Sequence, residues 1–102
     1  QVEYGLVFYK LDSKALLLKT YYEQGEWMVL ESLIDSFQIL LRRNKEVSKQ
    51  QRNNYLNLVK FVKKISRLMP DDIEKIKVLE QKIESANQVA DKGWLLEKLK
   101  EL

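Results

Sequence analysis

Apolar residues recur at intervals of three and four along most of the chain, a pattern that predicts amphipathic helices. The clearest stripe consists of Trp27, Leu30, Ile34, Phe37 and Leu41. A second stripe has the same spacing and consists of Tyr55, Leu58, Val62, Ile65 and Met69. A third consists of Ile76, Leu79, Ile83, Ala86 and Ala90. No segment shows the strict alternation of a half-buried strand.

In the first half of the chain, residues typical of helix ends indicate where the predicted helices begin and end. Asp12 or Ser13 is a suitable N-cap for a helix that runs to about Gln24. Gly25 then occupies the position just past its end, where a left-handed backbone is common. Residues 1 to 11 mix aromatic and β-branched side chains, and we expect them to form an irregular lead-in.

The second half divides in the same way. Ser48 with Gln51 three residues later predicts a capping box at the start of a third helix. Pro70 predicts its end and opens a fourth helix together with two aspartates. A short last helix is expected from about Asp91 or Lys92 to Leu102.

These elements predict a single all-α domain over residues 1 to 102, with about five antiparallel helices. A helical hairpin over 12 to 43 is followed by three further helices over 47 to 102. Only three glycines and one proline are present among 102 residues, which disfavours an all-β fold because such folds need frequent turns.

The stretch 15-ALLLKTYYEQGEWMVLESLIDSF-37 resembles a helical hairpin of the tetratricopeptide-repeat type. Leu17 matches the apolar position of the first helix, Tyr21 the following aromatic residue and Gly25 the turn glycine. The resemblance implies that Leu17 and Tyr21 pack against the partner helix. The whole chain is also similar to the C-terminal ends of large bacterial helical-repeat proteins of unassigned function, in which the last helix would cap the array. An α-solenoid fragment and an irregular helical bundle both remain open.

The same resemblance implies a groove that holds a peptide, because the first helix of such hairpins lines a concave surface. The matching candidates are Lys19, Tyr22 and Glu23, and a 34-residue period would add Asn53 and Asn57. Asparagine amides can hydrogen-bond an extended peptide backbone, and Lys19 can bind a carboxylate. The alternative is that Tyr22 is merely half-buried against the lead-in segment.

Basic residues are concentrated in the middle of the chain. Residues 42 to 69 hold nine lysines and arginines and a single acid, Glu46. Seven of these cations could form a patch that binds nucleic acid or another anion: Arg42, Arg43, Lys45, Lys60, Lys63, Lys64 and Arg67. A solvated helix face is the favoured alternative, since aromatic residues that might stack on bases are missing from the polar face of this segment.

Catalysis is not expected, because the chain contains no cysteine and no histidine. No cofactor or metal is expected either, although Glu31 and Asp35 share a helix face. No apolar run is long enough to span a bilayer, and a cytoplasmic location is favoured. The chain begins at Gln1 rather than methionine, which indicates a fragment or a processed product. The sequence therefore favours a non-catalytic protein–protein interaction or scaffold module, the terminal part of a larger helical-repeat protein. The alternative is anion binding through residues 42 to 67.

Overall fold

Five helices make up the computed structural model, which describes residues 2 to 102 and the side chains from Leu6 onwards. They are α1 (Val2–Gln24), α2 (Trp27–Arg43), α3 (Lys49–Ser66), α4 (Ile73–Ser85) and α5 (Lys92–Lys100). No strand is present within the described part of the chain, so the predicted all-α fold is confirmed.

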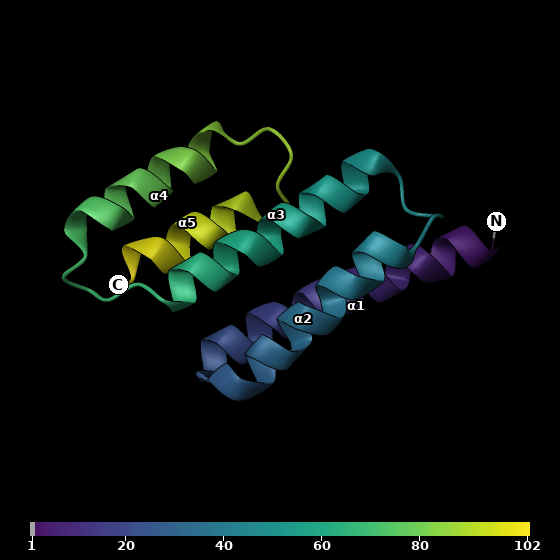
Figure 1. Ribbon diagram of the computed structural model, residues 1–102, viewed down its shortest axis with the longest axis horizontal. Helices are drawn as coiled ribbons and strands as arrows, with labels where there is room; N and C mark the ends of the chain where they lie inside the picture. The colour runs from purple at the N-terminus through teal and green to yellow at the C-terminus, as the bar shows by residue number, and fades with distance from the viewer. Residues whose placement is uncertain (1) are drawn as a thin grey trace.

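Consecutive helices run antiparallel, as Figure 1 shows. The α1–α2 hairpin packs against one side of α3, and α5 packs against another side of it. The second main contact of α5 is with α4, whereas α4 touches α3 very little. The last helix therefore lies between the third and the fourth, and attaches α4 to the rest of the molecule.

The expectation of an irregular lead-in is wrong for residues 2 to 11, because α1 begins at Val2 and is 23 residues long. Gln1 lies outside the described residues. Asp12 is consequently not an N-cap but lies in the middle of α1. Its carboxylate accepts a hydrogen bond from the hydroxyl of Tyr55, which joins α1 to α3. Burial, followed by this hydrogen bond, raises the pKa of Tyr55 well above its usual value.

Two further boundaries differ from the expected ones. The third helix ends at Ser66 rather than at Pro70, so Met69, the last member of its predicted stripe, lies in the connection and is exposed. The fourth helix ends at Ser85, and Ala86 and Ala90 lie in the loop that follows it. Apolar spacing alone cannot separate a helix from the loop that continues over the same core.

The predicted turn chemistry at Gly25 and Ser48 is present. Gly25 has a φ of 68°, in the left-handed region that glycine adopts without steric cost. Ser48 Oγ accepts the Gln51 N–H at 3.1 Å, and Gln51 Oε1 accepts the Ser48 N–H at 3.4 Å. This capping box fixes the start of α3.

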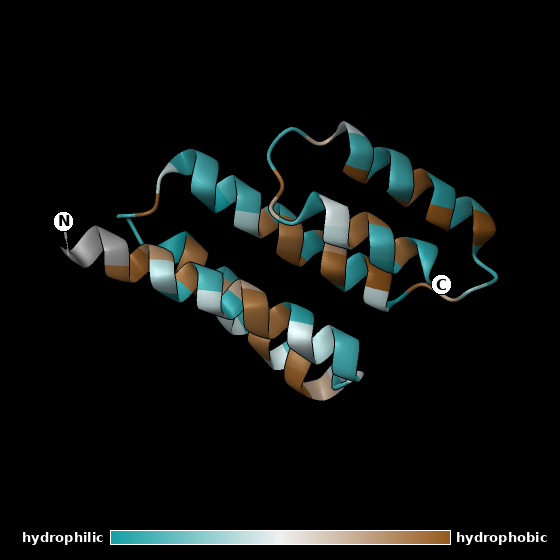
Figure 2. Ribbon diagram, turned by 180° about the vertical axis from the view of Figure 1, so that it is seen from behind, coloured by the Kyte–Doolittle hydropathy of each residue, from teal (hydrophilic) through white to brown (hydrophobic). Residues whose placement is uncertain are grey.

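The core follows the predicted stripes of α2 and α3 (Figure 2), except for Trp27 and Met69, which are exposed. Its largest fully buried side chains include Phe37, Leu18, Leu30, Ile34, Leu41, Leu58, Ile65, Ile83, Leu95 and Leu99. On α1 the buried leucine lies one residue later than the position that was predicted to pack against the partner helix. Leu18 is fully buried, whereas Leu17, expected to pack against the partner helix, is 39% exposed.

The connection between α2 and α3 is held by Arg52, which the sequence analysis did not single out. Its Nε donates to the Leu41 carbonyl at 2.8 Å, and its Nη2 donates to the Asn44 carbonyl at 2.8 Å. A longer contact of 3.4 Å reaches the Val47 carbonyl. These carbonyls belong to the end of α2 and the turn after it, where a helix leaves its acceptors unsatisfied. One guanidinium group from α3 therefore caps the preceding helix.

Replacing Arg52 with alanine should lower the free energy of unfolding by about 2 kcal/mol, because charge-assisted hydrogen bonds to partly buried carbonyls are lost. Arg52→Lys should recover less than half of this loss, since a single ammonium cannot reproduce the fork of the guanidinium. Urea denaturation monitored by circular dichroism measures both variants. An alanine variant as stable as the parent would contradict this role.

Candidate functional site

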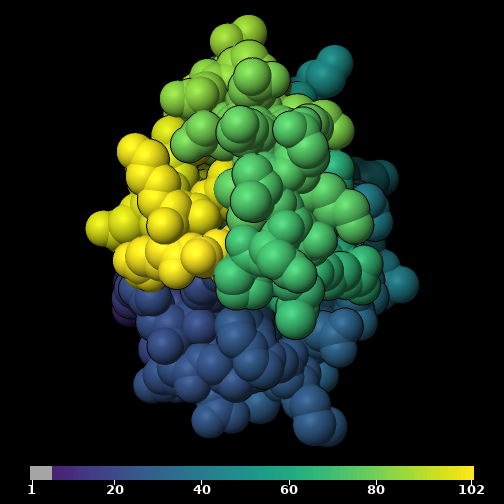
Figure 3. Space-filling model, turned by 90° about the vertical axis from the view of Figure 1, so that its left-hand side faces the viewer, coloured from purple at the N-terminus to yellow at the C-terminus, as the bar shows by residue number. Residues whose placement is uncertain are grey.

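The five residues predicted to line a peptide groove share one surface, formed by α1 and α3. Lys19, Tyr22 and Glu23 lie on the last two turns of α1, and Asn53 and Asn57 lie on α3. All five contact a single segment of the same chain, residues 88 to 98. Figure 3 shows the C-terminal segment in yellow lying directly over the end of the α1–α2 hairpin in blue.

On α3 the asparagines hold the loop between α4 and α5. Asn57 Nδ2 donates to the main-chain carbonyl of Gln88 at 2.6 Å, and Asn53 Nδ2 donates to the Gln88 side chain at 2.9 Å. The N–H of Ala90 donates to the Asn54 carbonyl at 3.0 Å. An asparagine that binds an extended backbone is the chemistry expected of a peptide groove. Here the bound backbone is the chain's own.

On α1 the aromatic ring of Tyr22 lies between two tryptophans. Its ring centroid is 5.5 Å from that of Trp94 and 5.4 Å from that of Trp27, and both pairs meet edge to face. Such pairs stabilise beyond the area that they bury. Burial raises the pKa of Tyr22 above its ordinary value. Tyr22 is half-buried, but against Trp94 of α5 and Trp27 at the start of α2 rather than against a lead-in segment.

Ion pairs complete the contact between α1 and the last helix. Lys19 Nζ lies 3.2 Å from the carboxylate of Asp91, and Lys98 Nζ donates to Glu23 at 2.8 Å. Lys98 also donates to Glu101 at 3.0 Å, and only 6% of its side chain is exposed. The hydrogen bond to Glu23, followed by that to Glu101, raises the pKa of Lys98 despite its burial.

Sequence reasoning missed Lys98, because lysines are almost always assigned to the solvent side. Its position carried a usable signal. It lies three residues after Leu95 and four after Trp94, so it belongs to the packed stripe of a short helix. The positively charged side chain is tolerated there because the carboxylates of Glu23 and Glu101 bind it and that of Glu97 lies 3.8 Å away.

The predicted basic patch divides into two groups. Arg42 and Arg43 lie at the end of α2 and Lys45 lies in the turn after it, before the start of α3. Lys60, Lys63, Lys64 and Arg67 lie on the second half of α3 and just past its end. The first group lies near Lys49, where α3 begins, and the second group begins at Lys60. About 16 Å of helix axis separates these two positions, at 1.5 Å for each residue. The seven cations therefore do not form one continuous surface.

Other chemistry is sparse within the described part of the chain. It holds no group of three or more carboxylates that could bind a metal ion. Glu31 and Asp35 line a small cleft of about 160 Å³ with Lys63 and Arg67, which face them from α3. Along the described residues, no helix has both the length and the apolar content needed to cross a bilayer.

The burial of Lys98 leads to an asymmetric prediction. Removing both carboxylates, in Glu23→Gln with Glu101→Gln, should destabilise the chain more than Lys98→Met does. The double variant leaves a buried ammonium without its closest counter-ions, whereas the methionine variant leaves two solvated carboxylates. Free energies of unfolding from urea titrations compare the two.

Lys100→Met is the matched control, because Lys100 is an exposed lysine of the same helix. It should leave stability unchanged. If Lys98→Met is the more damaging change, the attraction between the charges, rather than the cost of burying one of them, holds α5 in place.

Comparisons with known proteins do not supply a family for this chain. A scan against protein-family models, a search of curated proteins and a search of solved structures each find no match. The function therefore has to be inferred from the chain's own contacts, exposed faces and charges.

Proposed function

We propose that the chain is a non-catalytic protein–protein interaction module that docks on a helical partner through the outer face of α1. One observation carries this proposal: α1 is apolar on two opposite faces. A helix that is apolar all round is typical of a position buried on both sides. In this structure only one of its faces is covered.

The covered face of α1 holds Leu11, Ala15 and Leu18, all of which are buried in the core. The opposite face holds exposed apolar side chains, namely Leu6, Tyr9, Leu16 and Leu17. At 100° for each residue, these four positions fall within about 100° of one another. Tyr9 and Leu16 are 71% and 62% exposed. Ser13 is the exposed polar residue among them. Exposed apolar side chains gathered on one helix face mark interaction sites in soluble proteins.

The predicted peptide groove is already occupied, which favours docking through the outer face of α1. The groove candidates of α1 and α3 are committed to residues 88 to 98. A partner peptide would have to displace that segment before it could bind there. The outer face of α1 requires no such displacement.

The resemblance to tetratricopeptide-type hairpins suggests what the partner is. Stacked hairpins bury apolar helix faces against their neighbours, and a terminal unit needs a cover on its other side. We infer that a helical hairpin, in the same protein or in a second one, packs on the outer face of α1. In that arrangement α5 is the cover at the opposite end.

Nucleic-acid binding through residues 42 to 67 is the weaker candidate. The basic residues form two separate groups, and the aromatic residues of α3, Tyr55 and Phe61, are buried in the core. They are consequently unable to stack on bases.

Site-specific photo-crosslinking tests the docking face in cells that produce the full-length protein. A benzoyl-phenylalanine in place of Leu16 should give one discrete protein adduct, because this side chain would lie inside the interface. Adding Tyr9→Lys should reduce the yield of that adduct severalfold, since it places a charge on the same face.

The matched control is the same photo-reactive residue in place of Ile39, a half-exposed apolar side chain of α2. It should give no such adduct. An equal yield from both positions, or no adduct from position 16, would refute docking through α1.

A further inference from the structure

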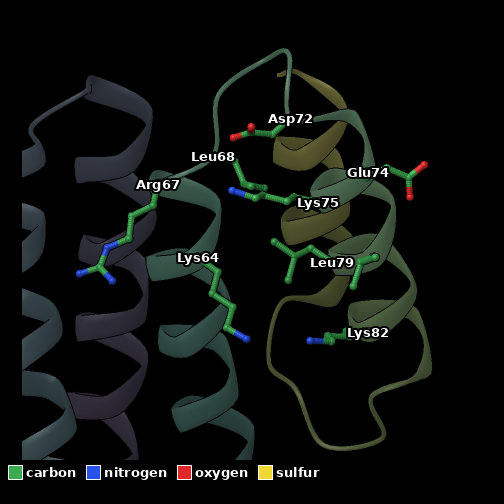
Figure 4. Close-up of a pocket in the computed structure, with 9 residues that line it drawn as sticks. Lys64, Arg67, Leu68, Asp72, Glu74, Lys75, Leu79 and Lys82 are labelled. Atoms are coloured by element: carbon green, nitrogen blue, oxygen red, sulfur yellow. The ribbon is translucent and has the colours of Figure 1, made fainter.

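A groove separates α3 from α4 on the side away from α1. It arises because α4 packs on α5 and hardly touches α3. A cleft of about 460 Å³ lies between Lys64 and Leu68 of the α3 side and Lys75, Val78 and Lys82 of α4 (Figure 4). This volume is in the range of sites that bind ligands.

A second cleft of about 330 Å³ continues the groove toward the other end of α4. It shares Lys64 and Lys82 with the first cleft and extends to Lys60 and Ala86. Together the two clefts run along α4, whose 13 residues span about 20 Å at 1.5 Å for each residue. The groove is therefore long enough to hold three to four turns of a helix.

Lysine side chains line the groove on both the α3 side and the α4 side. Lys60 and Lys64 belong to α3, and Lys75 and Lys82 belong to α4. Figure 4 shows the ammonium groups of Lys64 and Lys82 directed into the space between the two helices. Within the described part of the chain every ion pair involves either Lys19 or Lys98, so none of these four lysines pairs with a carboxylate.

Two carboxylates line the groove, those of Asp72 and Glu74, against five cations: Lys60, Lys64, Arg67, Lys75 and Lys82. The carboxylate of Asp72 accepts the N–H of Met69 at 3.0 Å and is committed to the turn before α4. Desolvation, followed by repulsion from Lys82 and Lys60, lowers the pKa of Lys64. Four lysines on two helices thus lie close enough together for some of them to repel one another, which a bound anion would relieve.

The floor between the two rows of lysines is apolar. Leu79 is buried, Leu68 is half-buried, and Val78 is 47% exposed. A phosphate backbone would match the lysines but leave this floor uncovered. The complement to the whole surface is a row of apolar side chains with carboxylates on either side.

We propose that the groove between α3 and α4 binds an acidic amphipathic helix of a partner protein. Its apolar side chains lie on Leu68, Val78 and Leu79, and its carboxylates meet the lysines of both walls. This is the helix-in-groove mode of recognition, with charge setting the choice of partner. The proposal does not rest on docking through α1, which uses a different helix.

Fluorescence anisotropy with the full-length protein tests the proposal directly. The probe is a fluorescein-labelled peptide of about 14 leucine and glutamate residues, long enough to span the groove as a helix, with leucines at helical spacing. It should bind at least about tenfold more tightly than a scrambled peptide of the same composition, a difference of about 1.4 kcal/mol. A labelled oligothymidylate of similar length is the third probe.

Charge reversal in the groove should remove this binding. Lys64→Glu with Lys82→Glu should weaken the amphipathic peptide about tenfold or more. Lys45→Glu with Lys49→Glu changes the net charge equally, outside the groove, and should alter affinity less than about twofold at moderate salt because of screening. Val78→Ser removes part of the exposed floor and should weaken binding severalfold. Circular dichroism confirms that each variant is folded.

Three results would overturn the proposal. Equal affinity for the amphipathic and scrambled peptides would show binding by charge alone. Tighter binding of the oligothymidylate, lost in the same double variant, would make the groove a nucleic-acid site. Equal weakening by the two double variants would show that the groove is not the binding place. None of these results bears on the crosslinking at Leu16.

Discussion

The placement of residues 88 to 98 on α1 and α3 determines where the last two helices lie. Asn57 binds the main chain of this segment at one end, and Lys98 meets Glu23 at the other. Tyr22 and Trp94 lie between these two contacts. Because α4 packs on α5 and hardly touches α3, the position of the fourth helix depends on that of the fifth. The cohesion of the last third of the chain therefore rests on one segment of eleven residues.

Two surfaces follow from this constraint. The segment covers the residues of α1 and α3 that it contacts, so the outer face of α1 is left as the main uncovered apolar surface of that helix. The same segment keeps α4 apart from α3, and the gap between them becomes a groove with lysines on both walls. One face is apolar and suited to helix stacking, whereas the other is cationic with an apolar floor. A module with two such faces can join two partners of different chemistry.

Local signals predicted much of the secondary structure and little of this arrangement. Gly25, Ser48 and Gln51 act within one turn of the chain, and the structure has them in the predicted roles. The start of α1 was missed because β-branched and aromatic residues are weak helix formers, and packing against the rest of the fold overrides that preference. Arg52 and Lys98 were missed because their partners are carbonyls and carboxylates brought near by folding. The candidate groove residues all contact residues 88 to 98, and nothing local in the sequence could indicate that the chain itself would cover them.

The most direct test of this account is the nuclear Overhauser effect between side chains of α1, α3 and residues 88 to 98. Close contact predicts cross-peaks from the Trp94 indole to the Tyr22 ring, and from the Asn57 side-chain amide to protons of Gln88. If both contacts are absent while the helices remain intact, the last helix does not fill the surface of α1 and α3. The placement of α4, and the groove beside it, would then have to be abandoned as well.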